Sequence, residues 1–490
     1  MYDMRPDLAR IGSVIARGPY GADWASLSGY TVPAWYAQAK FGIFIHWGVY
    51  SVPAFGNEWY SRNMYDPSHR EFQHHRAVYG DQKDFGYKDF IPLFTAERFD
   101  PERWAGLFAE AGARFVVPVA EHHDGFQMYK SDISRFNACE MGPRRDVLGE
   151  LKAACESRGL ILGASSHRAE HWFFMSKGRL IDSDIRDPLV RGDLYWPARP
   201  EPDHYDLFSQ PAPDEEFLND WLVRTCELID RYQPKVLYFD WWIQHAAFRP
   251  YLKKLAAYYY NRAAQWGTGA VITYKNEAFP FGCAVPDMER GQFADAQPCV
   301  WQADTSTALN SWCYTRDNRF RDPAGLVRDL VDVVSKNGCM LLNVGPKADG
   351  TVCEEDEAIL RAMGRWLRVN GEAVYGAKPF RRYGEGPTKI VEGQFSDGAE
   401  KAFTSRDFRF TMAGGALYAV ALRCSEDGTY LIRTLAQGDA SRGLSFNGII
   451  DGVSVLGWAE PPRWRVDGQG LHIRTDFRSD FPVVFRITLR

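Results

Sequence analysis

The stretch "KFGIFIHWGVYSVPAFGNEWYSRNMY", residues 40–65, starts as an apolar run and then breaks at a histidine, a tryptophan and a glycine. A buried strand usually ends at a turn residue rather than at an imidazole and an indole. Side chains of this kind at a strand end indicate a task beyond packing. His46 and Trp47 are therefore the first candidate residues, and Glu58 and Trp59 follow in the next loop.

Similar apolar runs recur along the chain, and amphipathic segments separate them. The runs are 41–45, 114–120, 159–166, 234–240, 269–275 and 338–345, and the segments with helical spacing include 101–113, 147–159 and 214–233. Strands that alternate with helices predict a parallel sheet. Because the runs are nearly continuous in Val, Ile, Leu and Phe, both sheet faces are expected to be buried, as in a (β/α)8 TIM-like barrel. A doubly wound sheet is the alternative, but neither GxGxxG after the first strand nor GxxxxGK[ST] occurs.

The pattern changes towards the C-terminus, where short alternating segments are broken by Gly, Asp and Ser. This pattern predicts a compact antiparallel β-sandwich. We therefore expect two domains, a catalytic barrel over residues 1–378 and a sandwich over residues 379–490 with a structural or interface role. The polar, glycine-rich stretch 384–403 is expected to be a loop or an edge connection within the second domain.

Composition narrows the class of partner. The 490 residues carry a formal charge of −5 without long like-charge runs, which argues against nucleic acid and anionic membranes as partners. Aromatic residues make up 14% of the chain and suit a protein that stacks on sugars. Nine cysteines without a CxxC pair indicate reduced thiols. We expect a cytoplasmic protein, although a periplasmic or secreted protein whose signal peptide had been removed would look the same.

In a (β/α)8 barrel the active site lies where the strands end, so polar residues just beyond each apolar run are the candidates. They are His46 and Trp47, Glu58 and Trp59, "EHHDGF" (121–126), "SSHRAEHW" (165–172), Asp240 with Trp241 and Trp242, and Glu289 of "DMERG" (287–291).

Two carboxylates stand out among these candidates. Asp240 closes an apolar run, where burial penalises a carboxylate unless it is used or paired, although a helix N-cap explains it equally well. Glycoside cleavage needs a second carboxyl group, and Glu289 suits that role by position. A surface salt bridge with Arg290 is the simpler interpretation of Glu289.

The histidines of "EHHDGF" could also be metal ligands. Adjacent side chains on an extended strand point to opposite sides, and the HExxH spacing is absent, so we expect neither a metal nor a cofactor. Imidazoles that bind sugar hydroxyls need no such spacing. One of His122 and His123 is expected to be a satisfied buried histidine, and at most one of His167 and His171 to face the pocket.

Taken together, "KFGIFIHWGVYSVPAFGNEWYSRNM", "EHHDGFQMYKSDISRFN", "RRDVLGELKAACESRGL", "YFDWW", "SWCY" and the long segment 335–376 resemble the α-L-fucosidases of glycoside hydrolase family twenty-nine. The resemblance runs from about residue 30 to residue 380. It implies a (β/α)8-like barrel followed by a β-sandwich, no metal requirement, and hydrolysis of terminal α-L-fucosides with retention. The implied partner is a fucosylated oligosaccharide or glycoconjugate, and a homo-oligomer is left open.

The resemblance also implies roles for individual residues. Asp240 corresponds to the nucleophile, and Glu289 looks like the proton donor, with Glu277 of "KNEAF" as its rival. The predicted substrate-binding set is His46, Glu58, Trp59, His122, His123, His167, Trp241 and Trp312. Within it, Trp59 and Trp312 would form an apolar wall for the C5 methyl group that separates fucose from galactose.

Two departures from the family pattern leave specificity open. Trp241 and Trp242 replace a Gly-Gly or Met-Gly pair and could narrow the pocket or reshape its leaving-group side, and "TYKNEAF" replaces an Asn-Asp-Arg segment, with Lys275 as the substitute for the arginine. An α-galactosidase or mixed-specificity glycosidase is therefore one alternative. A catalytically silent sugar-binding protein is another, and a metalloenzyme is the least favoured.

Overall fold

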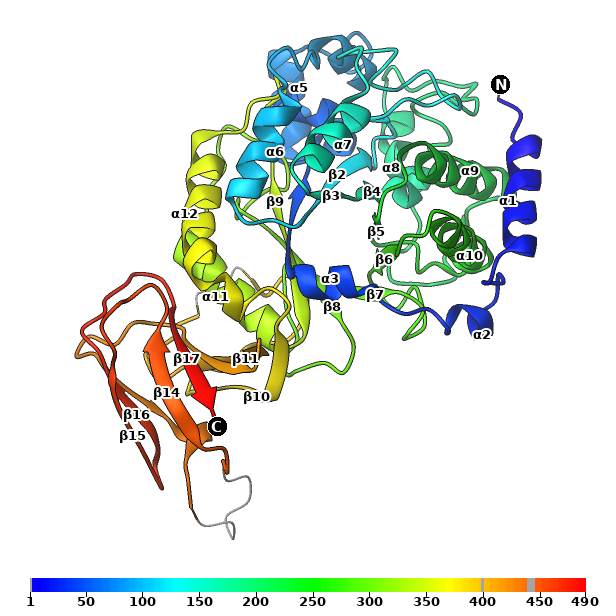
Figure 1. Cartoon of the computed structure of the whole chain (residues 1–490). Helices are drawn as coiled ribbons and strands as arrows, with labels where there is room; N and C mark the ends of the chain where they lie inside the picture. Colours follow the sequence, from blue (N-terminus) through cyan, green and yellow to red (C-terminus); the bar gives the residue numbers. More distant parts are fainter. Residues whose placement is uncertain (1, 398–400, 439–445) are drawn as a thin grey trace.

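The computed structural model describes residues 2–397, 401–438 and 446–490, and its larger part is a closed parallel barrel (Figure 1). The strand order is β1-β9-β8-β7-β6-β5-β4-β2-β3, and a further pairing of β1 with β2 closes the ring. The strands are β1 (Phe41–Ile45), β2 (Phe115–Glu121), β3 (Ile161–Leu162), β4 (Ala164–Ser166), β5 (Val236–Phe239), β6 (Val271–Tyr274), β7 (Val285–Glu289), β8 (Trp301–Ser306) and β9 (Gly338–Val344). Because only Gly163 separates β3 from β4, these two segments act as one strand of an eight-stranded barrel.

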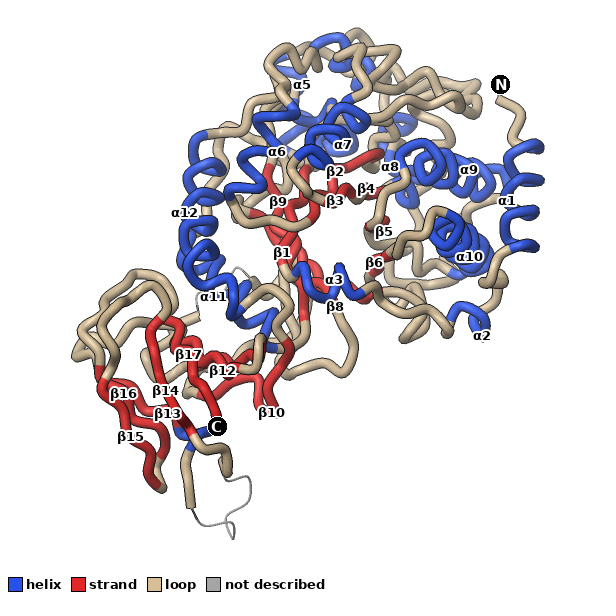
Figure 2. Tube along the Cα trace, viewed as in Figure 1, coloured by secondary structure: helices blue, strands red, loops and turns tan. Residues whose placement is uncertain are grey.

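Helices surround the barrel, as the blue segments of Figure 2 show. They are α1 (Arg5–Arg17), α2 (Trp24–Leu27), α3 (Ala34–Ala39), α4 (Tyr60–Asn63), α5 (Arg70–Val78), α6 (Pro101–Glu110), α7 (Val147–Ser157), α8 (His171–Phe174), α9 (Glu215–Tyr232), α10 (Arg249–Gln265), α11 (Pro323–Ser335) and α12 (Glu354–Asn370). In the described chain, no helix lies between β6 and β7 or between β7 and β8. None of the described helices combines the length and the apolarity needed to cross a bilayer.

Alternation along each strand builds two apolar layers. In β1, the Phe44 side chain joins a cluster inside the barrel, whereas Ile43 and Ile45 join the layer beneath the helices. This is the two-residue period of a strand that is buried on both faces. The predicted runs correspond to β1, β2, β3 with β4, β5, β6 and β9, while β7 and β8 were not predicted.

The C-terminal region forms two antiparallel sheets with a shared apolar core. Its strands are β10 (Lys378–Glu385), β11 (Phe408–Ala413), β12 (Ala416–Ala421), β13 (Thr429–Ile432), β14 (Ile450–Val455), β15 (Arg463–Asp467), β16 (Gly470–Arg474) and β17 (Val483–Leu489). The sheet β10-β11-β12-β17-β14 packs against α11 of the barrel, where buried Asp332 bonds both Lys336 and Arg409. The predicted barrel and β-sandwich are confirmed.

Candidate active site

A cavity of about 680 Å³ opens where the barrel strands end. All ten residues predicted for the site line it: His46, Glu58, Trp59, His122, His123, His167, Asp240, Trp241, Glu289 and Trp312. Glu277, the rival proton donor, lines the cavity as well. His171 and Trp242 are not among the lining residues.

Strand register brings the charged residues of the cavity to one level. Tyr238 of β5 is paired with Thr273 of β6, so Asp240 and Lys275, each two residues further on, lie side by side. Next along the sheet, Glu289 ends β7 opposite Asp304 of β8. The carboxyl ends of the neighbouring parallel strands β5, β6 and β7 therefore place a nucleophile candidate, a cation and an acid candidate next to one another.

Lys275 connects the two candidate catalytic carboxyl groups. Its Nζ donates to Glu289 Oε2 at 2.6 Å and to Asp240 Oδ1 at 3.2 Å. Since both oxygens bond one nitrogen, they can be no farther apart than about 5.8 Å, which agrees with the spacing of about 5 to 5.5 Å in retaining glycosidases rather than with the wider spacing of inverting ones. The Lys275 ammonium thus sets an upper limit on the separation on which the mechanism depends.

Lys275 is the cation at the centre of a carboxylate cluster, which we define as Asp240, Asp287, Glu289 and Asp304. Besides its two bonds, its Nζ lies 3.4 Å from Asp304 Oδ2 and 3.9 Å from Asp287 Oδ2. Burial alone would lower the pKa of Lys275, but the surrounding carboxylates raise it well above its usual value. One positive charge therefore faces four carboxyl groups.

The two candidate catalytic groups respond to this charge imbalance in opposite directions. Burial would raise the pKa of Asp240, but Lys275 and the hydrogen bonds from His167 and His123 hold it well below its usual range. For Glu289, burial raises the pKa to about 7; Lys275 opposes this shift, and the charge of Asp240 reinforces it. Near neutral pH, Asp240 is thus ionised and Glu289 can carry a proton. Burial and the charge of Asp304 also raise the pKa of Asp287 well above its usual value.

Two histidines bond the Asp240 carboxylate. His167 donates from Nδ1 to Asp240 Oδ2 at 2.8 Å, and His123 Nε2 lies 3.4 Å from the same oxygen. His123 Nδ1 also donates to the carbonyl of His167, so both of its nitrogens carry protons. Burial would lower the pKa of His123, but Glu170 and Asp240 raise it to about 9.

His46 and His122 are neutral imidazoles on the cavity wall. Burial lowers the pKa of each well below its usual value. His46 Nδ1 bonds Asn343 Oδ1 at 2.7 Å, and the Nδ1 atom of His122 has no hydrogen-bond partner in the described part of the chain. Neutral imidazoles can both donate to and accept from sugar hydroxyl groups.

A metal could in principle use these imidazoles. The donor atoms of His46, His122 and His167 lie within 4.8 Å of one another, as do those of His123, His167 and Asp240. However, His167 already uses both nitrogens, on Asp240 at 2.8 Å and on Ser165 Oγ at 2.9 Å. The arrangement therefore fits a hydrogen-bonded sugar site better than a ligand set for a cation.

Glu58 joins two loops at the cavity wall. Its Oε2 accepts the backbone N–H of Trp312 at 3.0 Å, and Trp312 packs beside His46 with a ring separation of 5.1 Å. Trp59 packs edge-on against His123. These contacts hold the two predicted apolar walls, Trp59 and Trp312, against the imidazoles.

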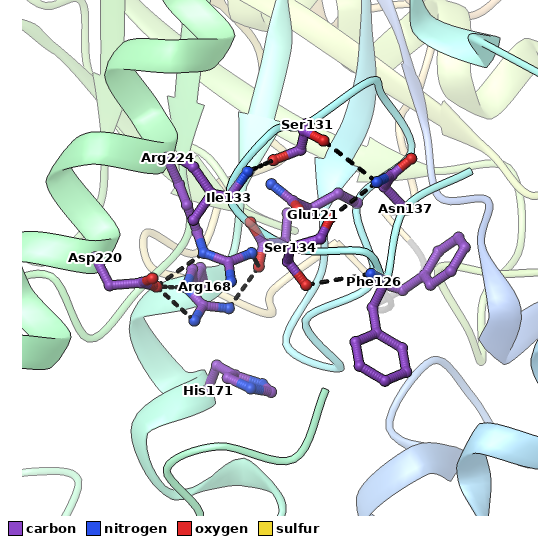
Figure 3. Close-up of polar contacts among 12 residues, drawn as sticks. Glu121, Phe126, Ser131, Ile133, Ser134, Asn137, Arg168, His171, Asp220 and Arg224 are labelled. Atoms are coloured by element: carbon purple, nitrogen blue, oxygen red, sulfur yellow. Dashed lines mark hydrogen bonds and ion pairs between the residues drawn. The ribbon is translucent and has the colours of Figure 1, made fainter. Parts of the chain in front are cut away.

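A second group of buried charges does not line the cavity: the buried ion network of Glu121, Arg168, Asp220 and Arg224 (Figure 3). Arg168 donates to Glu121 Oε1 at 2.6 Å and to Asp220 Oδ2 at 2.7 Å. Arg224 donates to the same Asp220 oxygen at 2.8 Å. The network ties α9 to the end of β2 and to the turn after β4, which carry the site histidines.

Both His122 and His123 line the cavity, as the predicted set has them, because β2 ends at Glu121 and the chain then turns. His123 is also the satisfied buried histidine expected of the pair, since its nitrogens contact the carbonyl of His167 and Asp240. Two other expectations from the sequence need correction. Glu289 pairs with Lys275, while Arg290 bonds the carbonyls of Ala308 and Ser311 instead. Of the two indoles after the nucleophile candidate, only that of Trp241 reaches the cavity.

Trp242, the second indole, is buried against Phe173 and Phe248.

Sequence reasoning also missed residues in and beside the cavity. Glu170 does not line the cavity, but its Oε1 lies fully buried 3.4 Å from His123 Nε2, and neither of its oxygens has a hydrogen-bond partner among the described residues. The sequence feature that could have indicated Glu170 is a carboxylate within the segment "HRAEHW", which follows a predicted strand. Gln394 and Phe395 reach the cavity from the segment after β10, and no local pattern announces them.

Comparisons with known proteins agree with this geometry. Residues 8–372 match the family described as alpha-L-fucosidase. The tissue α-L-fucosidase of Rattus norvegicus is 31% identical over 430 residues, covering 86% of this chain and 83% of the rat protein. That of Homo sapiens is 32% identical over 416 residues, covering 84% and 79%.

Among solved structures, the Thermotoga maritima α-fucosidase in complex with a mechanism-based inhibitor superposes with a TM-score of 0.75 at 29% identity, covering 96% of this chain and 100% of that one. The fold, the cavity and these relatives agree: the chain belongs to the α-L-fucosidase family of glycoside hydrolases.

Proposed function

We propose that this protein is an exo-acting, retaining α-L-fucosidase that removes terminal α-L-fucosyl residues from oligosaccharides or glycoconjugates. The observation that carries the proposal is the pair Asp240 and Glu289, bonded to one lysine on a cavity lined by imidazoles. The cavity reaches into the barrel as far as Phe44 and Tyr238, both fully buried. A blind cavity of this kind suits a terminal sugar.

The reaction proceeds in two displacements. Asp240 attacks the anomeric carbon, the bond to the leaving oxygen breaks, and Glu289 gives that oxygen its proton. Glu289 then takes a proton from water, which attacks the same carbon and releases Asp240 with overall retention. The low pKa of Asp240 and the raised pKa of Glu289, about 7, place each group in the protonation state that its first step needs.

The neighbouring side chains act on the bound sugar. His46 and His122 are placed to bond its hydroxyl groups, and Trp59 and Trp312 to cover its methyl group. The chemistry balances without a metal ion. All nine cysteines lie among the described residues and none forms a disulfide, which supports a reducing, cytoplasmic location as part of the proposal.

The test is hydrolysis of an aryl α-L-fucoside, an aryl α-D-galactoside and a panel of fucosylated oligosaccharides that differ in linkage, with the first-formed anomer followed by NMR. We expect α-L-fucose as the first product and a preference for the fucoside of about 100-fold or more. Comparable turnover of the galactoside would favour a mixed-specificity glycosidase. Calorimetric binding of fucose without hydrolysis would instead indicate a silent sugar-binding protein.

A further inference from the structure

The segment 392–397 leaves the β-sandwich after β10 and returns to the barrel beside the proton donor candidate. The N–H of Phe395 donates to the backbone carbonyl of Glu289 at 2.8 Å, and the N–H of Asp397 donates to the carbonyl of Arg290 at 2.8 Å. Gln394 Nε2 donates to Asn276 Oδ1 at 2.8 Å, next to Lys275 in sequence. The segment therefore runs along the end of β7, which carries Glu289.

Several contacts fasten this segment to the barrel. Asp397 Oδ2 accepts from Arg321 at 2.7 Å and from Thr305 Oγ1 at 2.5 Å. At its other end, Glu392 Oε2 accepts the N–H of Ala294 at 2.9 Å. Because charged and backbone bonds hold both ends, the side chains between them are presented in a fixed position.

Phe395 is unusual within this fastened segment. Its side chain lines the cavity and yet is 65% exposed, and its backbone has a φ of 56°, which bulky residues rarely adopt. Packing does not explain an exposed ring in an unfavourable backbone conformation. Such an outlier at the rim of a site points to contact with a ligand.

The position of Glu289 indicates which part of the substrate Phe395 contacts. The glycosidic oxygen must lie within hydrogen-bond reach of the Glu289 carboxyl group, so the leaving group extends from that oxygen. Phe395 and Gln394 border the part of the cavity beside Glu289, whereas His46 and His122 line the part where the fucose hydroxyl groups are proposed to bind. The segment thus faces the leaving group rather than the fucose.

We propose, on the basis of the proposed function, that the segment 392–397 of the C-terminal region forms a leaving-group subsite for a second pyranose. The ring of Phe395 covers the apolar C–H face of that sugar, and the amide groups of Gln394 and Asn276 bond its polar substituents. The substrate class is therefore a fucosyl group on another sugar ring rather than on a small alcohol. The C-terminal region then takes part in recognition, beyond the structural role that its sequence predicts.

The test compares the wild type with Phe395→Gly on a fucosylated disaccharide and on α-L-fucosyl fluoride, whose leaving group has no ring. Glycine adopts a positive φ freely, so Phe395→Gly removes the ring without straining the backbone. We expect kcat/KM on the disaccharide to fall about tenfold more than on the fluoride, with unchanged thermal stability. Gln394→Ala should reduce the disaccharide-to-fluoride ratio in the same direction, by a smaller factor.

Phe281→Ala is the matched control, because Phe281 is 74% exposed and is not among the residues that line the cavity. It should leave the ratio of the two kcat/KM values as in the wild type. Equal losses on both substrates for Phe395→Gly, or the same ratio as Phe281→Ala, would overturn the subsite. A wild type that hydrolyses neither fucoside would refute the proposed function instead, so the two failures are distinguishable.

Discussion

The buried ion network and the carboxylate cluster around Lys275 use the same kinds of side chain, yet their charges balance differently. The network matches Glu121 and Asp220 with two guanidinium groups, and these lower the pKa of Asp220 although burial would raise it. The cluster sets four carboxyl groups around Lys275, with the cationic His123 as a second partner of Asp240. The pKa of Glu289 rises to about 7, and that of Asp287 rises well above its usual value.

The comparison shows that two groups of buried charges in one barrel have different roles, one structural and one catalytic. Where each buried carboxylate has its own cation, all charges are fixed and the group holds elements together. Where carboxyl groups outnumber cations, protons take the place of the missing charges. Asp287 holds one of them away from the cavity, whereas Glu289 lines the cavity and can transfer its proton. We therefore expect mutations in the two regions to have different consequences.

The largest effect is expected from Asp240→Ala. Without the nucleophile, turnover of an aryl α-L-fucoside should fall about 10³- to 10⁴-fold. Added azide should restore turnover and yield a fucosyl azide, since a small anion can occupy the space that the carboxylate leaves. Activity near the wild-type level would remove Asp240 from the nucleophile role.

Glu289→Ala should have the next largest effect, and its size should depend on the leaving group. On a natural oligosaccharide we expect a loss of about 10²- to 10³-fold, and on an aryl fucoside with a good leaving group a much smaller loss, because only poor leaving groups need the proton. Glu277→Ala is the comparison variant. If Glu277→Ala shows this dependence and Glu289→Ala does not, the proton donor is Glu277.

In the buried ion network, Arg224→Met should reduce stability rather than alter the chemistry. It leaves Asp220 with one fewer cation, and breaking a buried pair costs about 3 to 5 kcal/mol in the free energy of unfolding, measurable by urea denaturation. Arg76→Met removes a half-exposed pair with Asp81 and should cost about 1 kcal/mol or less. A shift of the pH profile in Arg224→Met would show that the two regions are not separate.

The smallest of these effects is expected from Glu170→Gln, which replaces a buried carboxyl group 3.4 Å from His123 by an amide of the same shape. Burial raises the pKa of Glu170 well above its usual value, so the amide resembles its protonated form. The pKa of His123, about 9 in the wild type, should fall by the part that Glu170 contributes beside Asp240. A weaker interaction between His123 and the Asp240 carboxylate should reduce kcat/KM about tenfold or less. Nitrogen NMR of the His123 ring gives the direct readout, and an unchanged titration would contradict the assignment.

The strands and site residues could be predicted from the sequence where polar residues lie at the ends of apolar runs, and not where polar residues interrupt them. Strands such as β1 and β5 are unbroken apolar runs, so both the strands and the residues that follow them, His46 and Asp240, were predictable. Strands β7 and β8 were not, because Asp287 and Asp304 interrupt the apolar pattern. These side chains are buried, and the partners that allow it, Gln302 for Asp287 and Tyr238 for Asp304, are visible only in the folded barrel.

The missed site residues have a similar explanation. Gln394 lies more than a hundred residues after Glu289 in the sequence, and its place at the cavity depends on a segment that returns to the barrel from the C-terminal region. Strand-end reasoning can find only residues that the barrel itself delivers. Contributions from the C-terminal region require the three-dimensional structure.

The central claim is that burial and the neighbouring carboxylates, opposed by Lys275, keep a transferable proton on Glu289. Its most direct test is the pH dependence of kcat/KM in the wild type and in Lys275→Met. Lys275 lowers the pKa of both Asp240 and Glu289, so its loss should raise both. We predict a wild-type basic limb near pH 7 and a clear shift of both limbs to higher pH in the variant. A basic limb that stays at the same pH without Lys275 would contradict the account.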